Sequence, residues 1–206
     1  HQRSDHPPRA HELAGGRRLR RKELFAHWAD DGLLAHAQTG YHLLGRLCQE
    51  AILVLGPLDG TEQLVVSYAD WVPAPRRLAH DEALAELARR FFLSHGPATA
   101  ADLARWASLT LTAARAGAAA VRDEFAVVEF GGVEHLMDPA LPDLLAAYRR
   151  DALRLRLLPG FDEYILGYVD RSFAVPVAFA DQIVPGGNGM FRPTIVKAGV
   201  VIGTWK

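Results

Sequence analysis

A pattern of helical segments followed by a pair of strand-like segments occurs twice in this chain of 206 residues. The clearer copy begins with "HDEALAELARRFFLSHGP" (80–97), where apolar side chains recur at the spacing of one buried helical face. The capping-box pattern "TAAD" (99–102) predicts a second helix, and Thr112 is placed to cap a third that ends near residue 123. "FAVVEF", two glycines and "VEHLM" then predict a β-hairpin.

The other copy precedes this one. "RKELFAHWADDG" (21–32) and "QTGYHLLGRLCQEA" (38–51) have helical patterns, and "ILVLG" and "QLVVSY" flank the turn "PLDGTE" (57–62). Pro73 and Pro75 separate the copies, since neither a continuous helix nor a central strand accommodates them. Helices followed by a hairpin are the order of a winged helix-turn-helix, so the repeat predicts two such domains, at 1–75 and 76–140.

The remainder, 141–206, has a different composition. "LRLRLLP" alternates, "FAVPVAFADQIV" is apolar with a short helical pattern, and "FRPTIVK" and "GVVIGTWK" are strand-like. We therefore expect a mainly-β third domain and an α+β fold overall. The chain opens on His1 without a methionine and ends directly after a strand-like run, so we expect both ends to be truncated.

Composition limits the classes of function. The net charge of −1 argues against a strong attraction of the whole molecule for nucleic acid, although "RRLRRK" (17–22) is a local basic patch. The single cysteine, Cys48, cannot form an internal disulfide, which favours a reducing, cytoplasmic location. No apolar run approaches the roughly 18 residues of a membrane span. The nine histidines do not take metal-ligand spacing, so we expect no metal and no cofactor. The oligomeric state stays open.

Polar side chains follow one face of the helix predicted at 38–51. Gln and Arg side chains can bond to base edges, and a histidine can bond to a phosphate, so this face is a candidate DNA-reading surface. An ordinary solvated face is an equally good interpretation. The basic patch is either a phosphate-binding arm or a solvated helix start or loop. The candidate DNA contacts are Gln38, His42, Arg46 and Gln49 on the helix, and Arg17, Arg18, Arg20 and Arg21 in the patch.

The glycine-rich stretch "IVPGGNGMFRPT" (183–194) raises the question of a phosphate cradle. Such a cradle needs a strand before the glycines and a helix N-terminus after them, but the following residues are strand-like and include Pro193. We therefore predict a tight turn in which Gly and Asn supply positive φ. Asn188 and Arg192 remain candidates for contacting the DNA backbone.

Two adjacent carboxylates, Asp162 and Glu163, lie in "GFDEYILGYVDRS" (160–172). Such a pair can orient a water molecule for general base catalysis. Adjacent residues of a strand point to opposite faces, however, so a turn would be needed to bring both to one centre. The alternative is a turn or a helix cap, with Phe161, Tyr164 and Tyr168 in the core.

Four segments carry a resemblance to a known family: "DWVPAPRRL", "HGPATAADLARWASL", "LLPGFDEYILGYVDRS" and "PGGNGMFRPTIVKAGVVIGTWK". They resemble the bacterial winged-helix proteins that include the interstrand-crosslink DNA glycosylases, from about residue 20 to the end. The resemblance implies tandem winged helices, a barrel-like β domain and duplex DNA as partner. It also implies a Gln-x-Gln or Gln-x-Asp pair that positions the hydrolytic water. This sequence contains no such pair, so we expect no catalytic residue of that kind within it.

These observations predict a DNA-binding fragment of a winged-helix DNA glycosylase-like protein, acting in repair of alkylated or crosslinked bases. The full-length protein would expose a modified base and hydrolyse its glycosidic bond without a metal. Two alternatives stay open. One is a transcriptional regulator that reads sequence through a winged helix, and the other is a winged-helix scaffold for protein partners.

Overall fold

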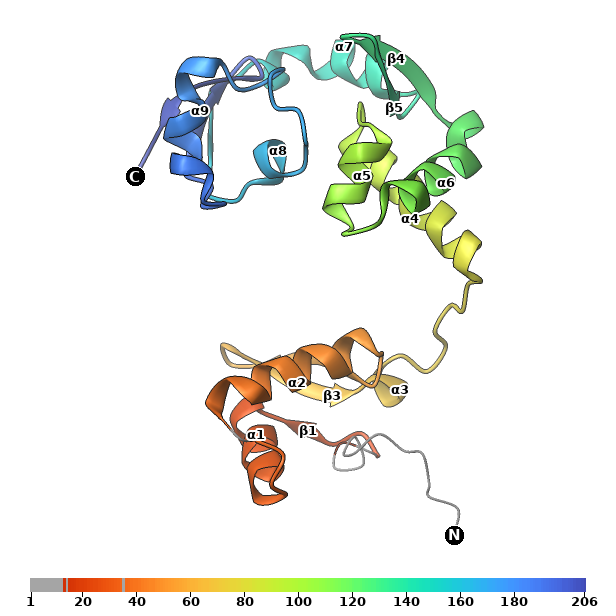
Figure 1. The fold of residues 1–206 in the computed structure, drawn as a ribbon, viewed down its shortest axis with the longest axis vertical. Coiled ribbons are helices and arrows are strands. Elements are labelled where there is room, and N and C mark those ends of the chain that lie inside the picture. Colours follow the sequence, from red (N-terminus) through yellow and green to blue (C-terminus); the bar gives the residue numbers. More distant parts are fainter. Residues whose placement is uncertain (1–12, 14, 35) are drawn as a thin grey trace. The chain divides into compact units, whose positions relative to one another are not determined.

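The structure is a computed structural model that describes residue 13 and residues 15–34 and 36–206. The chain divides into two compact units between Arg77 and Leu78 (Figure 1). The residues from 72 to 79, which include both prolines of the predicted boundary, form neither helix nor strand.

The first unit combines two long helices with a small antiparallel sheet. Its three strands are ordered β1-β3-β2, and α2 lies against the hairpin (Figure 1). Leu24 and Trp28 of α1 pack with Leu44 and Leu47 of α2 in the core. The elements are β1 (Arg18–Leu19), α1 (Arg21–Asp30), α2 (Ala37–Gln49), β2 (Leu53–Asp59), β3 (Glu62–Ser67) and α3 (Tyr68–Trp71).

The hairpin of the first unit is longer than predicted. Strand β2 continues to Asp59 and β3 begins at Glu62, so the turn consists of Gly60 and Thr61 rather than all of "PLDGTE". Gly60 has a φ of +64°, a conformation that glycine adopts at no steric cost. The predicted hairpin is thus confirmed, and its turn is shorter than predicted.

The second unit begins with helices α4 (His80–His95), α5 (Ala100–Trp106) and α6 (Leu111–Val121), a short turn η2 (Arg122–Glu124), and the hairpin of β4 (Ala126–Phe130) and β5 (Val133–Met137). The predicted order of three helices and a hairpin is confirmed. Phe91 and Phe92 of α4 are buried in the core with Leu103 of α5 and Val121 of α6.

Two helix starts of this region test the capping predictions. Thr99 caps α5 and forms the predicted capping box with Asp102. Helix α6, however, is capped by Thr110 and not by Thr112, because the Thr110 hydroxyl oxygen accepts the Ala113 N–H at 3.2 Å. Both threonines have the chemistry of a cap, so the sequence alone favoured the wrong one.

The C-terminal part of the second unit contains α7 (Leu141–Ala152), β6 (Arg156–Leu158), α8 (Glu163–Leu166), α9 (Val177–Ile183), the turn η3 (Pro185–Gly187), β7 (Thr194–Lys197) and β8 (Val200–Thr204). Its sheet has the order β6-β7-β8, and the edge strands β6 and β8 do not pair with each other. The expected mainly-β, barrel-like domain is therefore wrong for the described residues, which form a mixed fold with an open sheet. The missed α7 has apolar residues at helical spacing and a proline in its first turn, both helix signals.

The glycine-rich stretch forms η3 and the loop after it. Gly186, Gly187 and Gly189 all have positive φ, as predicted, whereas Asn188 has a φ of −75°. The Asn188 side chain instead accepts the Met190 N–H at 2.9 Å. The stretch links α9 to β7 rather than two strands, and a strand follows the glycines. The geometry that a nucleotide-phosphate cradle requires is not formed here.

Candidate nucleic-acid interface and carboxylate cluster

The predicted DNA-reading residues all lie on the exposed side of α2. Gln38, His42, Arg46 and Gln49 are exposed, while Leu44 and Leu47 are buried at 7% and 4% exposure. Positions i, i+4, i+8 and i+11 share one helical face, so the four polar side chains form a continuous row. We call these four residues the α2 row.

Arg46 has an intramolecular partner. Its Nε donates to Oε1 of Glu50 at 2.7 Å, one helical turn away, and 76% of the Arg46 side chain is exposed. Exposed ion pairs of this kind contribute between about 0 and 1 kcal/mol. The pair is therefore weak enough for Arg46 to exchange Glu50 for a phosphate or a base edge.

Gly45 lies on the same face, between His42 and Gln49. A Cβ atom built at Gly45 would meet nothing within 4 Å, whereas one at Gly40 would lie 2.9 Å from the Phe25 ring. Packing against α1 thus accounts for Gly40 but not for Gly45. A helical glycine costs about 1 kcal/mol relative to alanine, so Gly45 lowers stability and leaves a flat surface beside the α2 row.

The basic patch is held by the fold rather than extended as an arm. Arg18 belongs to β1 and lies over the Trp71 ring, 5.7 Å from its centroid. Arg20 forms an ion pair with Asp59, and Arg21 lies 5.3 Å from the centroid of the Tyr41 ring on α2. These contacts hold the side chains of Arg18, Arg20 and Arg21 against the first unit. Arg17 is exposed just before β1.

Asn188 and Arg192 are exposed residues of the second unit. The backbone N–H of Arg192 donates to the Ile183 carbonyl at 2.9 Å, which fixes the loop between η3 and β7 to the end of α9. Both side chains are thus presented from an anchored loop.

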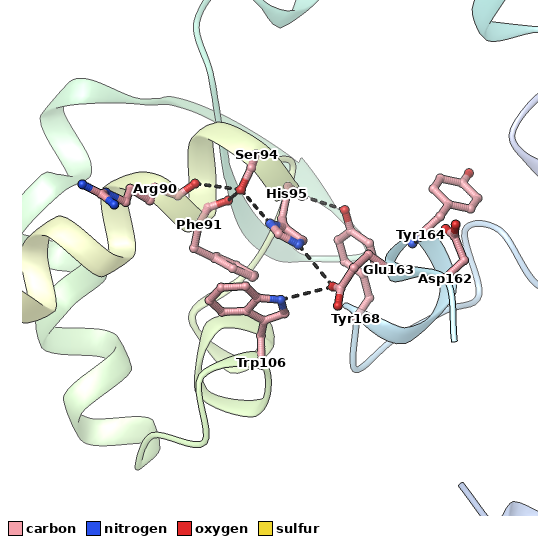
Figure 2. A network of polar contacts seen from close by, with 9 residues as sticks. All are labelled: Arg90, Phe91, Ser94, His95, Trp106, Asp162, Glu163, Tyr164 and Tyr168. Carbon is pink, nitrogen blue, oxygen red and sulfur yellow. Dashed lines mark hydrogen bonds and ion pairs between the residues drawn. The ribbon is translucent and has the colours of Figure 1, made fainter. Parts of the chain in front are cut away.

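The two adjacent carboxylates have different hydrogen-bond partners. Asp162 caps α8, and its Oδ1 accepts the Tyr164 N–H at 3.0 Å. Glu163 points the other way, toward α4 and α5 (Figure 2). Its Oε2 accepts the Trp106 Nε1–H at 3.1 Å and lies 3.3 Å from Nε2 of His95. The pair does not converge on one centre.

Glu163, His95 and Trp106 form what we call the Glu163 cluster. The His95 ring stacks on Phe91 with centroids 4.7 Å apart and planes inclined by 10°. Its Nδ1 lies 2.8 Å from the Ser94 hydroxyl oxygen, which donates its own hydrogen to the Arg90 carbonyl.

The Glu163 cluster is partly open to solvent. The His95 side chain is 15% exposed and that of Glu163 is 56% exposed. The cluster therefore offers solvent an oriented carboxylate whose Oε1 has no hydrogen-bond partner in the part of the chain that the structure describes.

Sequence reasoning selected Glu163 but missed His95 and Trp106. They lie 68 and 57 residues from Glu163 along the chain. The sequence does contain a histidine near the end of the helix in "FFLSHGP" and a tryptophan in the next helix. Nothing in the sequence distinguishes these two residues from ordinary core residues.

Neither a membrane segment nor a metal centre emerges from the described residues. None of their helices is long and apolar enough to cross a membrane. Within the same residues, no group of three or more His, Cys, Asp or Glu side chains is arranged to hold a metal ion.

Comparison with known proteins identifies the family to which the chain belongs. Residues 4–206 match the family model described as "DNA glycosylase AlkZ-like". The chain belongs to the AlkZ-like DNA glycosylase family. An "Interstrand DNA cross-link repair glycosylase" of Streptomyces sahachiroi is 30% identical over 141 residues, which are 67% of this chain and 37% of the relative.

A solved structure agrees with this assignment. The fold is similar to that of Streptomyces sahachiroi DNA glycosylase AlkZ, with a TM-score of 0.72 and 25% sequence identity. The match covers 96% of this chain and 56% of that chain. The family that the sequence motifs indicated is thus confirmed, and the chain spans less than two thirds of either relative.

Proposed function

We propose that this chain is the DNA-binding part of a winged-helix DNA glycosylase-like protein that acts in repair of alkylated or crosslinked DNA bases. The observation that carries the proposal is the α2 row, a continuous polar face on a helix whose opposite face is buried. Membership of the AlkZ-like family supports the choice of duplex DNA as partner over a protein partner.

The proposed architecture is two winged helices, at 1–75 and 76–140, followed by a third domain at 141–206. In support, each unit contains helices followed directly by a two-stranded antiparallel hairpin. In the first unit α2 is the helix immediately before the hairpin, the position from which a recognition helix enters the major groove. The corresponding helix α6 is rich in alanine and suits packing better than readout.

Each residue of the proposed interface has a role. Gln38, Gln49 and Arg46 would bond to base edges, and His42 to a phosphate. Arg17, with its neighbours in the basic patch, and the loop residues Asn188 and Arg192 would contact phosphates. Such contacts position the duplex without reading its sequence.

We assign the hydrolytic step to a Gln pair that this sequence does not contain, so the chain by itself would bind DNA without cleaving the glycosidic bond. Glu163 is the better of the two carboxylates for orienting a water molecule, because Asp162 is engaged as a helix cap. That role would be tested in the full-length protein by comparing the rate of base release by Glu163→Gln with that of the unaltered protein, since the substitution keeps the size of the side chain and an acceptor oxygen but removes the charge.

The test of the proposal is a duplex-DNA titration at several salt concentrations. Arg46→Ala should weaken binding by roughly 1–3 kcal/mol if Arg46 bonds to a base, with relaxed sequence preference. If Arg46 contacts only phosphate, the loss should be uniform across sequences and the salt slope should fall by about one. Thermal stability should change by no more than about 0.5 kcal/mol, because Arg46 is exposed.

Glu50→Gln is the matched variant, since it releases Arg46 from its intramolecular partner and removes a negative charge. It should strengthen binding. Unchanged affinity and salt slope in both variants would show that α2 does not contact DNA. Preference for one undamaged sequence would favour the transcriptional regulator, and preference for an alkylated duplex would favour repair.

A further inference from the structure

Helix α7 of the second unit lies almost entirely in solvent. Every residue from 142 to 157 is exposed, and no residue of the helix is buried. Its last turn and the residues after it read "YRRDALRLR" (148–156), with four arginines and one aspartate, a net charge of +3. The whole chain has a net charge of −1, so this segment differs in sign from the rest. We call its four arginines the α7 patch: Arg149, Arg150, Arg154 and Arg156.

Two of these arginines have no carboxylate partner. The side chains of Arg149 and Arg150 form neither an ion pair nor a hydrogen bond with any residue that the structure describes. Asp143, the acidic residue in the first turn of α7, lies at the opposite end of the helix. Two exposed positive charges are therefore available to an external anion.

The other two arginines are held around Asp151 at the end of the helix. Nη1 of Arg154 lies 3.1 Å from Oδ1 of Asp151, and Nη2 of Arg156 donates to the Asp151 carbonyl at 2.9 Å. The ion pair is a weak restraint, because 68% of the Arg154 side chain and 57% of the Asp151 side chain are exposed. One carboxylate balances one of the four charges, so the α7 patch keeps an excess of positive charge.

The end of the helix accounts for only part of this arrangement. Cations in the last turn of a helix interact favourably with its dipole, and Arg149 and Arg150 lie in the last turn of α7. Arg154 and Arg156 lie beyond the helix, where the effect of the dipole falls off. Each guanidinium has five N–H donors, and most of those in the α7 patch have no acceptor among the described residues.

The chemistry of the α7 patch suits phosphate groups. All four of its cations are arginine rather than lysine. A guanidinium can bind a phosphate through two parallel hydrogen bonds, whereas an ammonium acts as a point charge. Tyr148, which is 61% exposed just before the patch, has a hydroxyl that can also donate to a phosphate.

We propose that the α7 patch binds the phosphate backbone of duplex DNA. The choice of DNA rests on the proposed function, but the site lies on a different element from α2 and does not require that α2 contacts DNA. Contacts between arginine and phosphate add affinity by releasing counterions and do not read the sequence. The second unit thereby gains a DNA contact of its own.

The test is a titration of the full 206-residue chain with labelled duplex DNA at several salt concentrations. Arg149→Ala/Arg150→Ala should bind roughly tenfold or more weakly than the unaltered chain at about 50 mM salt. Its salt slope should be lower by about two, one for each lost phosphate contact, and the loss should be the same for unrelated duplex sequences.

Two matched variants control for net charge and for folding. Arg90→Ala/Arg115→Ala removes the same positive charge from exposed positions of α4 and α6, and should leave the salt slope nearly unchanged. Arg149→Lys/Arg150→Lys keeps the charge of the α7 patch, and should keep the salt slope of the unaltered chain. Thermal unfolding should be similar in all these proteins, because the substituted side chains are exposed.

The outcomes separate this inference from the proposed function. If the unaltered chain binds DNA and Arg149→Ala/Arg150→Ala binds with the same affinity and slope, the inference is wrong and the proposed function stands. If Arg46→Ala has no effect while the α7 variant weakens binding, the inference stands and the role of α2 is wrong. A chain that does not bind duplex DNA at any salt concentration contradicts both.

Three further results would overturn the inference. One is an equal loss in Arg90→Ala/Arg115→Ala, which would show that only net charge matters. Another is a loss that Arg149→Lys/Arg150→Lys does not restore. The third is tighter binding to phosphatidylserine vesicles than to duplex DNA, which would show that the α7 patch serves a lipid surface.

Discussion

At the scale of single residues, Asp102 connects two parts of the second unit. It is 4% exposed, and its Oδ2 accepts the Thr99 N–H at 2.8 Å and the Thr99 hydroxyl at 2.7 Å. Its Oδ1 accepts the Val169 N–H, 67 residues away, at 2.7 Å. One carboxylate therefore completes the capping box of α5 and holds the segment after α8. The buried charge is stabilised by three converging donors.

Removing this carboxylate should destabilise the whole unit. Asp102→Ala leaves the N–H groups of Thr99 and Val169 without an acceptor, so we expect a loss of about 2–4 kcal/mol in the free energy of unfolding. Chemical denaturation of both proteins measures the difference. Asp181→Ala, at an exposed position of α9, is the control and should stay within about 0.5 kcal/mol of the unaltered chain. A comparable effect of the two substitutions would refute the connecting role.

Tyr168 provides a second prediction at this scale. Its hydroxyl donates to the His95 carbonyl at 2.8 Å. Burial, followed by the negative charge of Asp102, raises the pKa of Tyr168 to about 12. The unfolded chain loses this proton near pH 10, so the contribution of Tyr168 to stability is complete below that value and is lost as pH rises toward 12.

Denaturation midpoints between pH 9 and 11.5 should therefore fall more steeply for the unaltered chain than for Tyr168→Phe. Over this pH range, the unaltered chain should lose about 1–2 kcal/mol more of its free energy of unfolding than Tyr168→Phe loses. The figure is moderate because the Tyr168 side chain is only partly buried. At neutral pH, Tyr168→Phe should cost about 1 kcal/mol for the lost hydrogen bond. Parallel pH profiles of the two proteins would contradict this account.

At the scale of elements, two helices contain a glycine for different reasons. A Cβ at Gly117 of α6 would lie 2.9 Å from the Leu84 carbonyl oxygen, so α4 and α6 pack backbone to backbone there. A Cβ at Gly45 of α2 would meet nothing within 4 Å. Close helix packing therefore requires the first glycine and does not require the second.

Alanine at the two positions should have opposite effects. Gly117→Ala should destabilise the second unit by about 1–3 kcal/mol, because the backbone of α4 must move. Gly45→Ala should stabilise the first unit by roughly 0.5–1 kcal/mol, the difference in helix propensity. Thermal unfolding followed by circular dichroism compares them, and destabilisation by Gly45→Ala would reveal a packing role that the structure does not contain.

At the scale of the whole molecule, the cores are divided between the two units. One core, which includes Trp28, lies entirely before Arg77, and the other two lie entirely after it. In the second unit, the hydrogen bond that Asp102 accepts from Val169 and the one that Tyr168 donates to His95 join the α4–α6 region to the C-terminal part. The second unit should consequently unfold as one cooperative body, although it contains two cores.

This division predicts the pattern of limited proteolysis. Trypsin should cleave first at Arg77, because the residues from 72 to 79 form neither helix nor strand and Arg77 is exposed. The fragment 78–206 should remain folded, and its NMR spectrum should overlay that of the same residues in the intact chain. Rapid cleavage within α4–α6 or in the C-terminal part after this cut would show that the second unit is not independently stable.

The sequence by itself determined the features that depend on near neighbours. The apolar spacing of α4, the Thr99–Asp102 capping box and the two hairpin turns each involve groups only a few residues apart. The quoted motifs also indicated the family. Tertiary structure decided the rest: which of two threonines caps α6, the open sheet, and the contacts of Glu163 with His95 and Trp106. Those contacts join residues far apart along the chain, and local propensity contains no information about which distant donor a carboxylate will meet.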